Sequence, residues 1–550
     1  MMPTLMYSFK DLSSLIKKKI SREQFEESLK FAKAELERFS GDEILVKFND
    51  TNQPHLWTVE GLAIFLQGIL GVEEGIPVVK TSGKYCEVRV EKSVRGIRQY
   101  ISAFKVENIV VTEEFLAQLI QSQEKICDVY GRKREKIAVG IYPSRKISFP
   151  VTFKAVQPKS VRFTPLGMFE DLNLQEILDN HPKGLEYGKI ISGFKKYPLL
   201  VDSSRNVLSF PPIINSSDLG AVEPGVDELF FEVTGTDHQL VNVVSSIFAH
   251  SFSMRGGVII PGKIFFEGKK VIAPKIAPVS FKLPEDVIER TLGRSFSEKE
   301  KKDAFRKMRL DYSAGKVLLP SYRADVIHPV DLVEDLAISA GYDNIKPLPM
   351  TTYTVGGMTP LMPLINSLRF LSVGAGFQET FSQLLTGEEI MSDRMGCPDF
   401  GSVKVKNYSS ANYSMLRTWI IPQLLEILSK NKHNVYPQKL FEEGVVVVRN
   451  DDDVKEYERI AFASSHTNVD FTELKQVFDF IFRGIGVVPV YEECEHKSFI
   501  QGRVASISVN GTKIAFIGEI HPQVLSSFGL ELSVVAAELN ITLLSEAMNK

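Results

Sequence analysis

A chain of 550 residues is too long to fold around one hydrophobic core, because cores stop growing at about 250–300 residues and chains then divide into domains. The length therefore predicts about three or four domains. Hydrophobic residues make up 44% of the chain and charged residues 24%, which is typical of an ordinary globular protein. The net charge of -3 argues against nucleic-acid binding by the charge of the whole protein, but it leaves room for local basic patches.

Cysteine spacing and apolar runs narrow the class of protein further. The four cysteines lie far apart and form no CxxC pair, so they predict neither a zinc site nor a disulfide framework. The first residues lack the apolar stretch and the cleavage site of a signal peptide. No apolar run approaches the roughly 18 residues of a membrane span. We therefore expect a cytoplasmic protein that has no membrane contact.

The first 75 residues have the pattern of a small α/β module. A capping box at Ser21–Gln24 predicts a helix, whose apolar face continues through Leu36. Ile44–Phe48 is strand-like, and a second helix is expected from about Thr58 to Leu70, closed by Gly71 in a left-handed cap. We assign this module to residues 1–75.

The next two segments mix helices and strands. In residues 76–269, the apolar strands Leu199–Val201 and Val207–Phe210 flank a polar turn, which indicates a hairpin. Phe230–Val233 is a further strand, and Thr236 or Asp237 can cap the helix that follows it. A shorter α/β unit, which contains a charged helix opened by a serine cap, is expected over residues 270–347.

Residues 348–550 indicate a further domain built on a sheet. The segments 445–448, 461–463 and 514–517 are rich in β-branched residues, as strands are. Helices from about 420 to 430 and from 472 to 482 are expected to cover one side of that sheet. The predicted fold class is therefore a multidomain α+β protein.

The densest acidic cluster of the chain is a candidate metal site. Its members are Asp325, Asp331, Glu334 and Asp335. Pro329 suits the first turn of a helix, and the last three acids then stand at i, i+3 and i+4 on one face. Four carboxylates from adjoining elements suit Mg²⁺. The alternative is an acidic first turn that complements the helix dipole.

The same segment, DVIHPVDLVEDLAISAGYDNI, closely resembles the metal-binding segment of phenylalanyl-tRNA synthetase β subunits. Arg323, the four acids and residues 341–345 match the pattern of that family. The resemblance implies that Asp325, Asp331, Glu334 and Asp335 bind Mg²⁺ near the contact with an α subunit.

Two further segments, SFPPIIN and VTGTD, resemble the editing domain of this family, which in archaeal and eukaryotic forms hydrolyses tRNA wrongly charged with tyrosine. An apolar phenylalanine pocket cannot strongly reject an analogue that only adds a hydroxyl, so a second site must recognise that hydroxyl. The resemblance implies that Glu232 does so, that Leu200 and Thr234 shape the pocket, and that Ser209 holds substrate or water. Read without the resemblance, these residues are hairpin and helix-cap positions. The chain departs from the family pattern at Ile141-Tyr142-Pro143, where a G-[I/V]-H-D turn is usual.

The C-terminal domain carries the longest resemblance, which includes YSMLRTWIIPQLL at residues 413–425. It is similar to a class II synthetase catalytic fold, an antiparallel sheet domain, that has lost its chemistry. No glycine-rich closing motif with an arginine for ATP is present, so the charge of an adenylation transition state has no evident partner. We expect no catalytic residue for aminoacylation here, and we expect ATP and phenylalanine to be bound by the α subunit.

Together these resemblances imply the β subunit of an α₂β₂ phenylalanine-tRNA ligase of the archaeal and eukaryotic cytosolic type, acting on tRNA(Phe). The predicted domains are the N-terminal module (1–75), an editing domain (76–269), a metal-binding domain (270–347) and an inactive synthetase-like domain (348–550). Two alternatives stay open, namely a free-standing editing or tRNA-binding factor and a scaffold whose editing site is dead.

Overall fold

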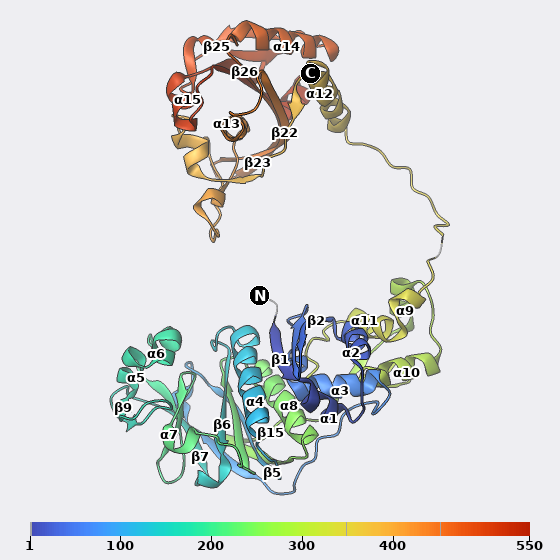
Figure 1. Cartoon of the computed structure of the whole chain (residues 1–550), viewed down its shortest axis with the longest axis vertical. Helices are drawn as coiled ribbons and strands as arrows, with labels where there is room; N and C mark the ends of the chain where they lie inside the picture. Colours follow the sequence, from blue (N-terminus) through green and yellow to red (C-terminus); the bar gives the residue numbers. More distant parts are fainter. Residues whose placement is uncertain (1–2, 348, 452, 550) are drawn as a thin grey trace. The chain divides into compact units, whose positions relative to one another are not determined.

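The computed structural model describes residues 3–347, 349–451 and 453–549, and it divides into two units, Met1–Pro349 and Met350–Lys550 (Figure 1). The predicted boundary at 347/348 lies close to this division. Within the described ranges, no helix is long and apolar enough to cross a membrane.

Unit 1 begins with a small antiparallel sheet in the order β1-β3-β2. Its elements are β1 (Thr4–Ser8), α1 (Phe9–Ile16), α2 (Arg22–Leu29), β2 (Ala34–Ser40), β3 (Glu43–Phe48) and α3 (Val59–Ile69). The capping box at Ser21 is confirmed, and Gly71 adopts the predicted left-handed conformation. The extension of the first helix to Leu36 is wrong, because a left-handed Lys33 ends a short 3₁₀ turn and the chain then enters β2.

A large mixed sheet follows in the order β12-β11-β10-β7-β4-β14-β5-β13-β6, with β15 paired to β14. Its strands are β4 (Cys86–Val90), β5 (Tyr100–Glu107), β6 (Ile137–Pro143), β7 (Val151–Val156), β10 (Tyr197–Val201), β11 (Val207–Phe210), β12 (Ile214–Asn215), β13 (Leu229–Gly235), β14 (Val258–Phe266) and β15 (Lys269–Ala273). The predicted hairpin is confirmed as β10 and β11. The boundary at 269/270 is wrong, because β15 crosses it and belongs to this sheet.

Helices pack against the large sheet, while its other face encloses an apolar core formed mainly by its own strands. The helices are α4 (Glu113–Lys125), α5 (Leu174–Asn180), α6 (Pro182–Tyr187), α7 (Ser217–Gly220) and α8 (His238–Met254), and a two-stranded ribbon of β8 (Arg162–Phe163) and β9 (Leu172–Asn173) adjoins α5. Helix α8 packs on β5 and β13, and Asp237 caps it as predicted. Helix α4 is followed at once by a π-helical turn, η4 (Ile126–Tyr130).

The last part of unit 1 is a small sheet in the order β16-β18-β17, covered by helices. Its elements are β16 (Val279–Lys282), α9 (Glu285–Leu292), α10 (Glu298–Lys307), β17 (Asp311–Ser313), β18 (Lys316–Leu319) and α11 (Pro329–Ala340). The predicted serine cap is confirmed, since Ser297 and Glu300 form a complete capping box on α10. Pro329 opens α11 as expected.

Unit 2 is built on a sheet in the order β19-β22-β23-β27-β26-β25-β24, antiparallel except for the pair β19 and β22. Its main strands are β19 (Gln378–Glu379), β22 (Gln438–Asn450), β23 (Asp453–Ser465), β24 (Val490–Glu493), β25 (Phe499–Val509), β26 (Thr512–Ile520) and β27 (Val534–Asn540). Its helices are α12 (Leu361–Gly374), α13 (Ile421–Lys430), α14 (Phe471–Gly484), α15 (Pro522–Phe528) and α16 (Ile541–Met548). The three predicted strand segments fall within β22, β23 and β26.

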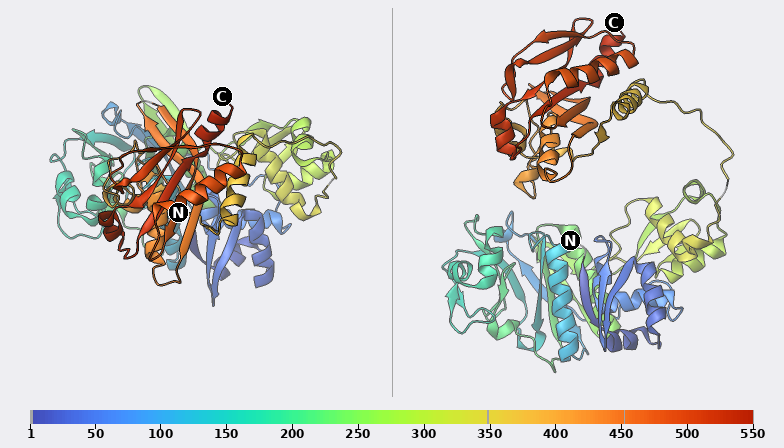
Figure 2. Two further views of the ribbon diagram at one scale, coloured as in Figure 1. Left: turned by 90° about the horizontal axis from the view of Figure 1, so that it is seen from above. Right: turned by 45° about the horizontal axis from the view of Figure 1, so that its top comes forward.

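The two predicted helices of unit 2 do not cover the same side of its sheet. Successive residues of a strand point to opposite faces, and on β23 Ala461 packs in the core that contains α13, whereas Phe462 packs in the core that contains α14. Figure 2 shows α14 lying along its face of the sheet. The sheet is therefore buried on both faces, which the segment pattern alone did not reveal.

Candidate editing site

Strand β13 places one carboxylate on a sheet face that is otherwise apolar. All its residues are buried, and they alternate between two cores. Phe231 packs against Phe248 of α8, with ring centroids 4.8 Å apart. Phe230 and Glu232 point the other way, toward β10 and β11. A strand that is paired on both sides, with β5 and β6, thus holds Glu232 rigidly and away from bulk water.

Gly140 makes room for this carboxylate. It lies directly opposite Glu232 on β6, and a Cβ atom at this position would collide with the hydroxyl of Tyr142 and with Oε1 of Glu232. Only glycine at position 140 therefore leaves space for the side chains of Tyr142 and Glu232 to meet.

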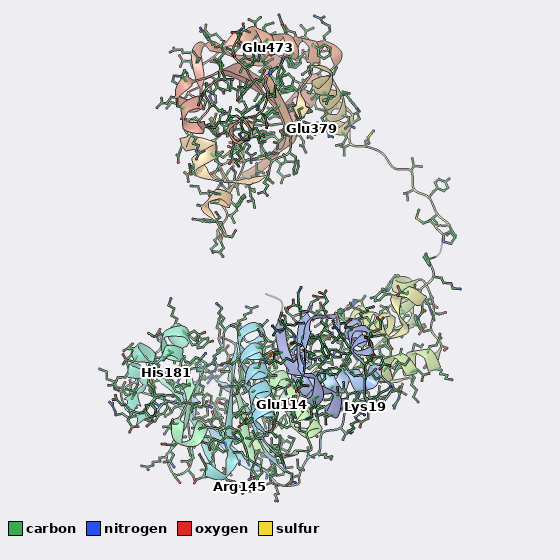
Figure 3. The ribbon with its side chains drawn as sticks, viewed as in Figure 1. Lys19, Glu114, Arg145, His181, Glu379 and Glu473 are labelled. Atoms are coloured by element: carbon green, nitrogen blue, oxygen red, sulfur yellow. The ribbon has the colours of Figure 1, made fainter. Side chains whose placement is uncertain are left out.

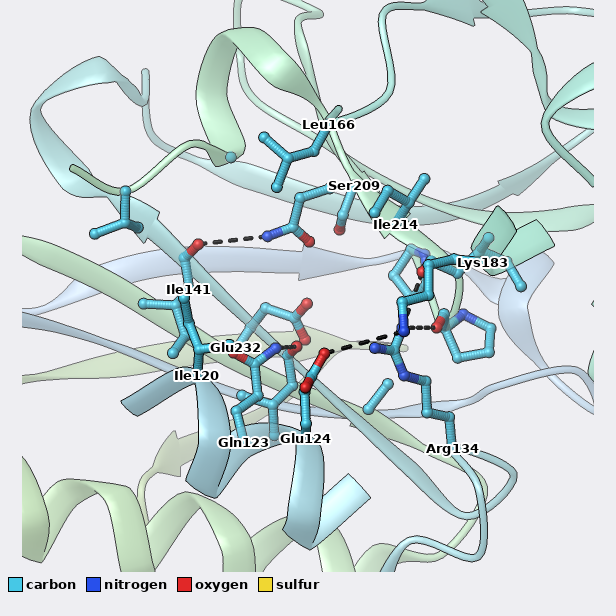
Figure 4. A pocket seen from close by; sticks show the side chains of 18 of the residues that line it. Ile120, Gln123, Glu124, Arg134, Ile141, Leu166, Lys183, Ser209, Ile214 and Glu232 are labelled. Atoms are coloured by element: carbon cyan, nitrogen blue, oxygen red, sulfur yellow. Dashed lines mark hydrogen bonds and ion pairs between the residues drawn. The ribbon is translucent and has the colours of Figure 1, made fainter. Parts of the chain in front are cut away.

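A cavity of about 370 Å³ opens beside Glu232 (Figure 4). Helix α4 supplies the apolar residues Leu116, Leu119 and Ile120 to its wall, and the segment 211–215 supplies another side. Ser209 and Glu232 are polar groups that also line the cavity. A mostly apolar cavity of this size with a few convergent polar groups is the usual form of a small-molecule site.

Glu232 is prepared to accept a hydrogen bond. Its exposed fraction is 2%, and its Oε2 atom accepts no hydrogen bond from any residue that the structure describes. Burial raises the pKa of Glu232 to about 7, although a hydrogen bond from Tyr142 and the charge of Arg98 act in the opposite direction. A buried acceptor that lacks a donor is costly, so a ligand hydroxyl that donates to Oε2 would be strongly favoured.

Tyr142 fixes the orientation of Glu232. Its hydroxyl lies 3.1 Å from Glu232 Oε1, 2.8 Å from Ser209 Oγ and 3.5 Å from Asn215 Oδ1. A phenol has one proton, so when Glu232 is ionised Tyr142 donates to it and accepts from Ser209. The sequence analysis did not assign Tyr142 a role, although the departure from the family pattern at this position is a signal that could have found it.

The four predicted pocket residues do not all reach the cavity. Ser209 and Glu232 line it, whereas Leu200 and Thr234 are fully buried behind it. Leu200 pairs with Ser209 across the hairpin and packs in the apolar core. Thr234 accepts a hydrogen bond of 3.1 Å from Arg98 Nε. Leu200 and Thr234 share a sheet face with Ser209 and Glu232, respectively. The expectation that they shape the wall is corrected because Leu200 is covered by the apolar core and Thr234 is engaged by Arg98.

The mouth of the cavity carries charged residues. Glu124, Arg134 and Lys183 line it, and Lys183 pairs with Glu124 at 4.0 Å and with Glu186 at 3.3 Å. His181, labelled in Figure 3, stabilises the segment around Lys183 through two hydrogen-bonding contacts. Its Nδ1 accepts from the Lys183 N–H at 3.0 Å, and its Nε2 lies 3.2 Å from the carbonyl of Leu166.

The predicted metal ligands are held by other partners. Arg323 donates to both oxygens of Asp325 at 2.8–3.1 Å and to Asp335 at 2.8 Å. All three side chains are 5% exposed. Burial alone would raise the pKa of Asp325, but the charge and hydrogen bonds of Arg323 hold that pKa below its usual value. A guanidinium therefore lies between the two carboxylates where a cation would have to bind.

The other two acids point elsewhere. Asp331 accepts hydrogen bonds from the backbone N–H groups of Ile327 and His328, each at 2.8 Å, as a helix-start acid does. Glu334 is exposed and pairs with Lys33 at 2.6 Å. Among the residues that the structure describes, no group of three or more His, Cys, Asp or Glu side chains converges on a possible metal site. The donor set thus does not fit Mg²⁺ in this arrangement.

In unit 2, Arg417 lies in the segment that resembles a synthetase core, and neighbouring side chains of the same domain bury it. Arg417 is 4% exposed and Glu442 is fully buried. The guanidinium of Arg417 donates to Glu442, Ser382, Gln423 and the carbonyl of Val445. Because the guanidinium of Arg417 donates its hydrogen bonds to groups inside the protein, it is not available to a nucleotide phosphate.

Family models identify the general class of protein. Residues 281–342 match the tRNA synthetase B5 domain, and residues 345–541 match the phenylalanyl tRNA synthetase beta chain CLM domain. Both matches point to a synthetase subunit.

Full-length relatives identify the family. The chain is 36% identical over 550 residues to the phenylalanine–tRNA ligase beta subunit of Pyrococcus abyssi, covering 98% of this chain and 99% of the relative. It is 35% identical to the phenylalanine–tRNA ligase beta subunit of Thermofilum pendens, and the match covers 98% of this chain and 98% of the relative. A crystal structure of an N-terminal fragment of the phenylalanyl-tRNA synthetase beta subunit of Pyrococcus horikoshii matches with a TM-score of 0.59 and 35% identity, over 62% of this chain and all of the fragment. The chain belongs to the family of phenylalanine–tRNA ligase beta subunits.

Proposed function

We propose that this chain is the β subunit of an α₂β₂ phenylalanine-tRNA ligase in the cytoplasm, and that its cavity hydrolyses tRNA(Phe) wrongly charged with tyrosine. The observation that carries the second part is Glu232, a buried carboxylate with an unused oxygen beside an otherwise apolar cavity. A tyrosine side chain fills such a cavity with its ring and donates its hydroxyl to Oε2. A phenylalanine side chain leaves that acceptor unpaired, which disfavours its binding.

Synthesis is assigned to the α subunit, which binds ATP and phenylalanine. The closed Arg417–Glu442 network supports this assignment. A contact surface for the α subunit is supported by exposed apolar side chains of unit 2, among them Phe370 and Phe381, which are 79% and 91% exposed. Exposed large apolar side chains mark sites of protein association where they gather into a contiguous patch.

The relatives favour the ligase subunit over a free-standing factor, because they match along 98% of this chain and carry the name of a ligase subunit. Mg²⁺ at Asp325, Asp331, Glu334 and Asp335 stays a prediction, and it requires that Arg323 and Lys33 release these carboxylates first.

The test is hydrolysis of tyrosyl-tRNA(Phe) by the α–β complex, followed with the tyrosine labelled. Glu232→Ala is expected to lower the rate by about tenfold to a hundredfold, the range for a hydrogen bond to a charged group. Phenylalanylation by the same complex should not change. Glu223→Ala, an exposed acid outside the cavity wall, is the matched control. A wild-type complex that clears no tyrosyl-tRNA(Phe) would favour the scaffold hypothesis.

A further inference from the structure

The loop between η4 and β6 has an unusual backbone. Arg132, Lys133 and Arg134 all adopt positive φ, with values of 50°, 52° and 65°. This backbone conformation is strained for a residue other than glycine, and three such residues in succession must be held in it by their surroundings. Part of the explanation is local, since the N–H groups of Lys133 and Arg134 satisfy the carbonyls of Asp128 and Cys127 at the end of the π-helical turn.

Arg98 secures this loop from inside the protein. It is 1% exposed, and its guanidinium donates to the carbonyls of Arg134 and Glu135 at 3.2 and 3.4 Å. It also donates to the side chain and the carbonyl of Thr234 at 3.1 and 2.8 Å. Arg98 therefore ties the strained loop to β13, the strand that carries Glu232.

The loop presents the side chain of Arg134 at the mouth of the cavity (Figure 4). Its Nη1 atom donates to the carbonyls of Pro212 and Ile213 at 3.1 and 2.9 Å, and its guanidinium lies 4.4 Å from the ring of Tyr187. Lys183 beside it is paired with Glu124 and Glu186. No carboxylate within the described ranges forms an ion pair with Arg134, so its charge and its Nε and Nη2 donors remain available.

Arg134 also lines a second hollow, which opens beyond the mouth of the cavity. Both hollows share Glu124, Arg134 and Lys183, and the second extends to Tyr187 of α6 and Arg38 of β2. If an amino acid reaches Glu232, the shared residues offer a continuous path along which the nucleotide that carries it can extend into the second hollow. The first phosphate of the nucleic acid then passes the unpaired guanidinium.

We propose that Arg134 binds the 5′-phosphate of the terminal nucleotide of the charged tRNA, and that Arg98 is the positioning residue that holds Arg134 in place. This inference rests on the proposed editing function. A planar guanidinium suits a phosphate because it offers two parallel donors. The strained loop is explained by the same role, since it fixes the side chain before the substrate arrives.

The test measures binding, so that it is independent of hydrolysis. The probes are 3′-deoxy-3′-(L-tyrosylamido)adenosine, which cannot be hydrolysed as an ester, and its 5′-monophosphate. Calorimetry with the α–β complex is expected to show that the phosphate tightens binding by about tenfold to a hundredfold. Arg134→Gln should abolish that difference. The readout is the ratio of the affinities for the two probes, because Arg134 also bonds to the wall residues Pro212 and Ile213 and its loss can change both affinities alike. Arg132→Gln, in the same loop but exposed and outside both hollows, should behave as the wild type.

Arg98→Lys keeps the charge but loses the planar fork, so it should weaken binding of the phosphorylated probe alone. Thermal unfolding and phenylalanylation establish whether that variant is folded, and Arg134→Gln decides the matter if it is not. A wild type that binds both probes equally, or an Arg134→Gln variant that keeps the phosphate preference, would overturn the inference. Either result leaves the editing proposal standing, whereas phosphate-dependent binding without hydrolysis of tyrosyl-tRNA(Phe) refutes the editing proposal alone.

Discussion

Replacing Glu232 by glutamine should separate function from stability, because the two depend on the same buried charge in opposite ways. Burial raises the pKa of Glu232 from 4.5 to about 7. In the unfolded chain the carboxyl ionises at its ordinary pKa. Between these two values the folded state binds more protons than the unfolded state, so the free energy of unfolding falls as the pH rises through this window.

The magnitude follows from the two pKa values. One pH unit of difference corresponds to ~1.4 kcal/mol, so ionising Glu232 in the folded protein costs about 3 kcal/mol above pH 7. Glutamine keeps the shape and carries no charge. At pH 8 the Glu232→Gln variant should therefore be more stable than the wild type by up to about 3 kcal/mol, while at pH 5 the difference should shrink to below about 1 kcal/mol.

The assay is urea unfolding of the β chain at pH 5 to 8, followed by tryptophan fluorescence. Trp57 is fully buried in unit 1, and a Trp419→Phe background removes the signal of unit 2. The same variant should lose its preference for tyrosyl-tRNA(Phe). Glu223→Gln serves as the exposed control. If the variant is no more stable than the wild type at pH 8, Glu232 is not an ionised buried group and the proposed recognition of tyrosine loses its physical basis.

Three further outcomes are expected. Tyr142→Phe removes a hydrogen bond that lowers the pKa of Glu232, so the pH profile of tyrosyl-tRNA(Phe) hydrolysis should shift to higher pH, and an unchanged profile would contradict this. Asp335→Asn leaves the buried Arg323 without one of its two carboxylate partners and should lower the free energy of unfolding of unit 1 by about 3–5 kcal/mol, whereas Asp331→Asn should lower it by only about 1 kcal/mol. Chelation with EDTA should leave the unfolding midpoint of the isolated chain unchanged. A marked drop in that midpoint would instead support bound Mg²⁺. The isolated chain should not exchange pyrophosphate with ATP in the presence of phenylalanine, and measurable exchange would place a synthetic site in this chain.

The sequence alone determined the features that depend on a few neighbouring residues. The caps at Ser21, Asp237 and Ser297 were read correctly, because a capping side chain bonds to a backbone group within three residues. The hairpin of β10 and β11 and the family membership were also accessible, since turn residues and long stretches of similar sequence lie contiguously along the chain.

Only the tertiary structure decided what those residues face. Tyr142 meets Ser209 and Glu232 across 67 and 90 positions of sequence, and the order of the strands brings them together. Packing also covers Leu200 with the apolar core and engages Thr234 with Arg98, so neither residue lines the cavity. Likewise, the spacing of Asp325 and Asp335 suggested a cation but did not identify Arg323 as the cation between them. Spacing fixes which side chains share a helix or strand, but packing between distant elements fixes burial, and burial determines the charge and the available partner of each acid.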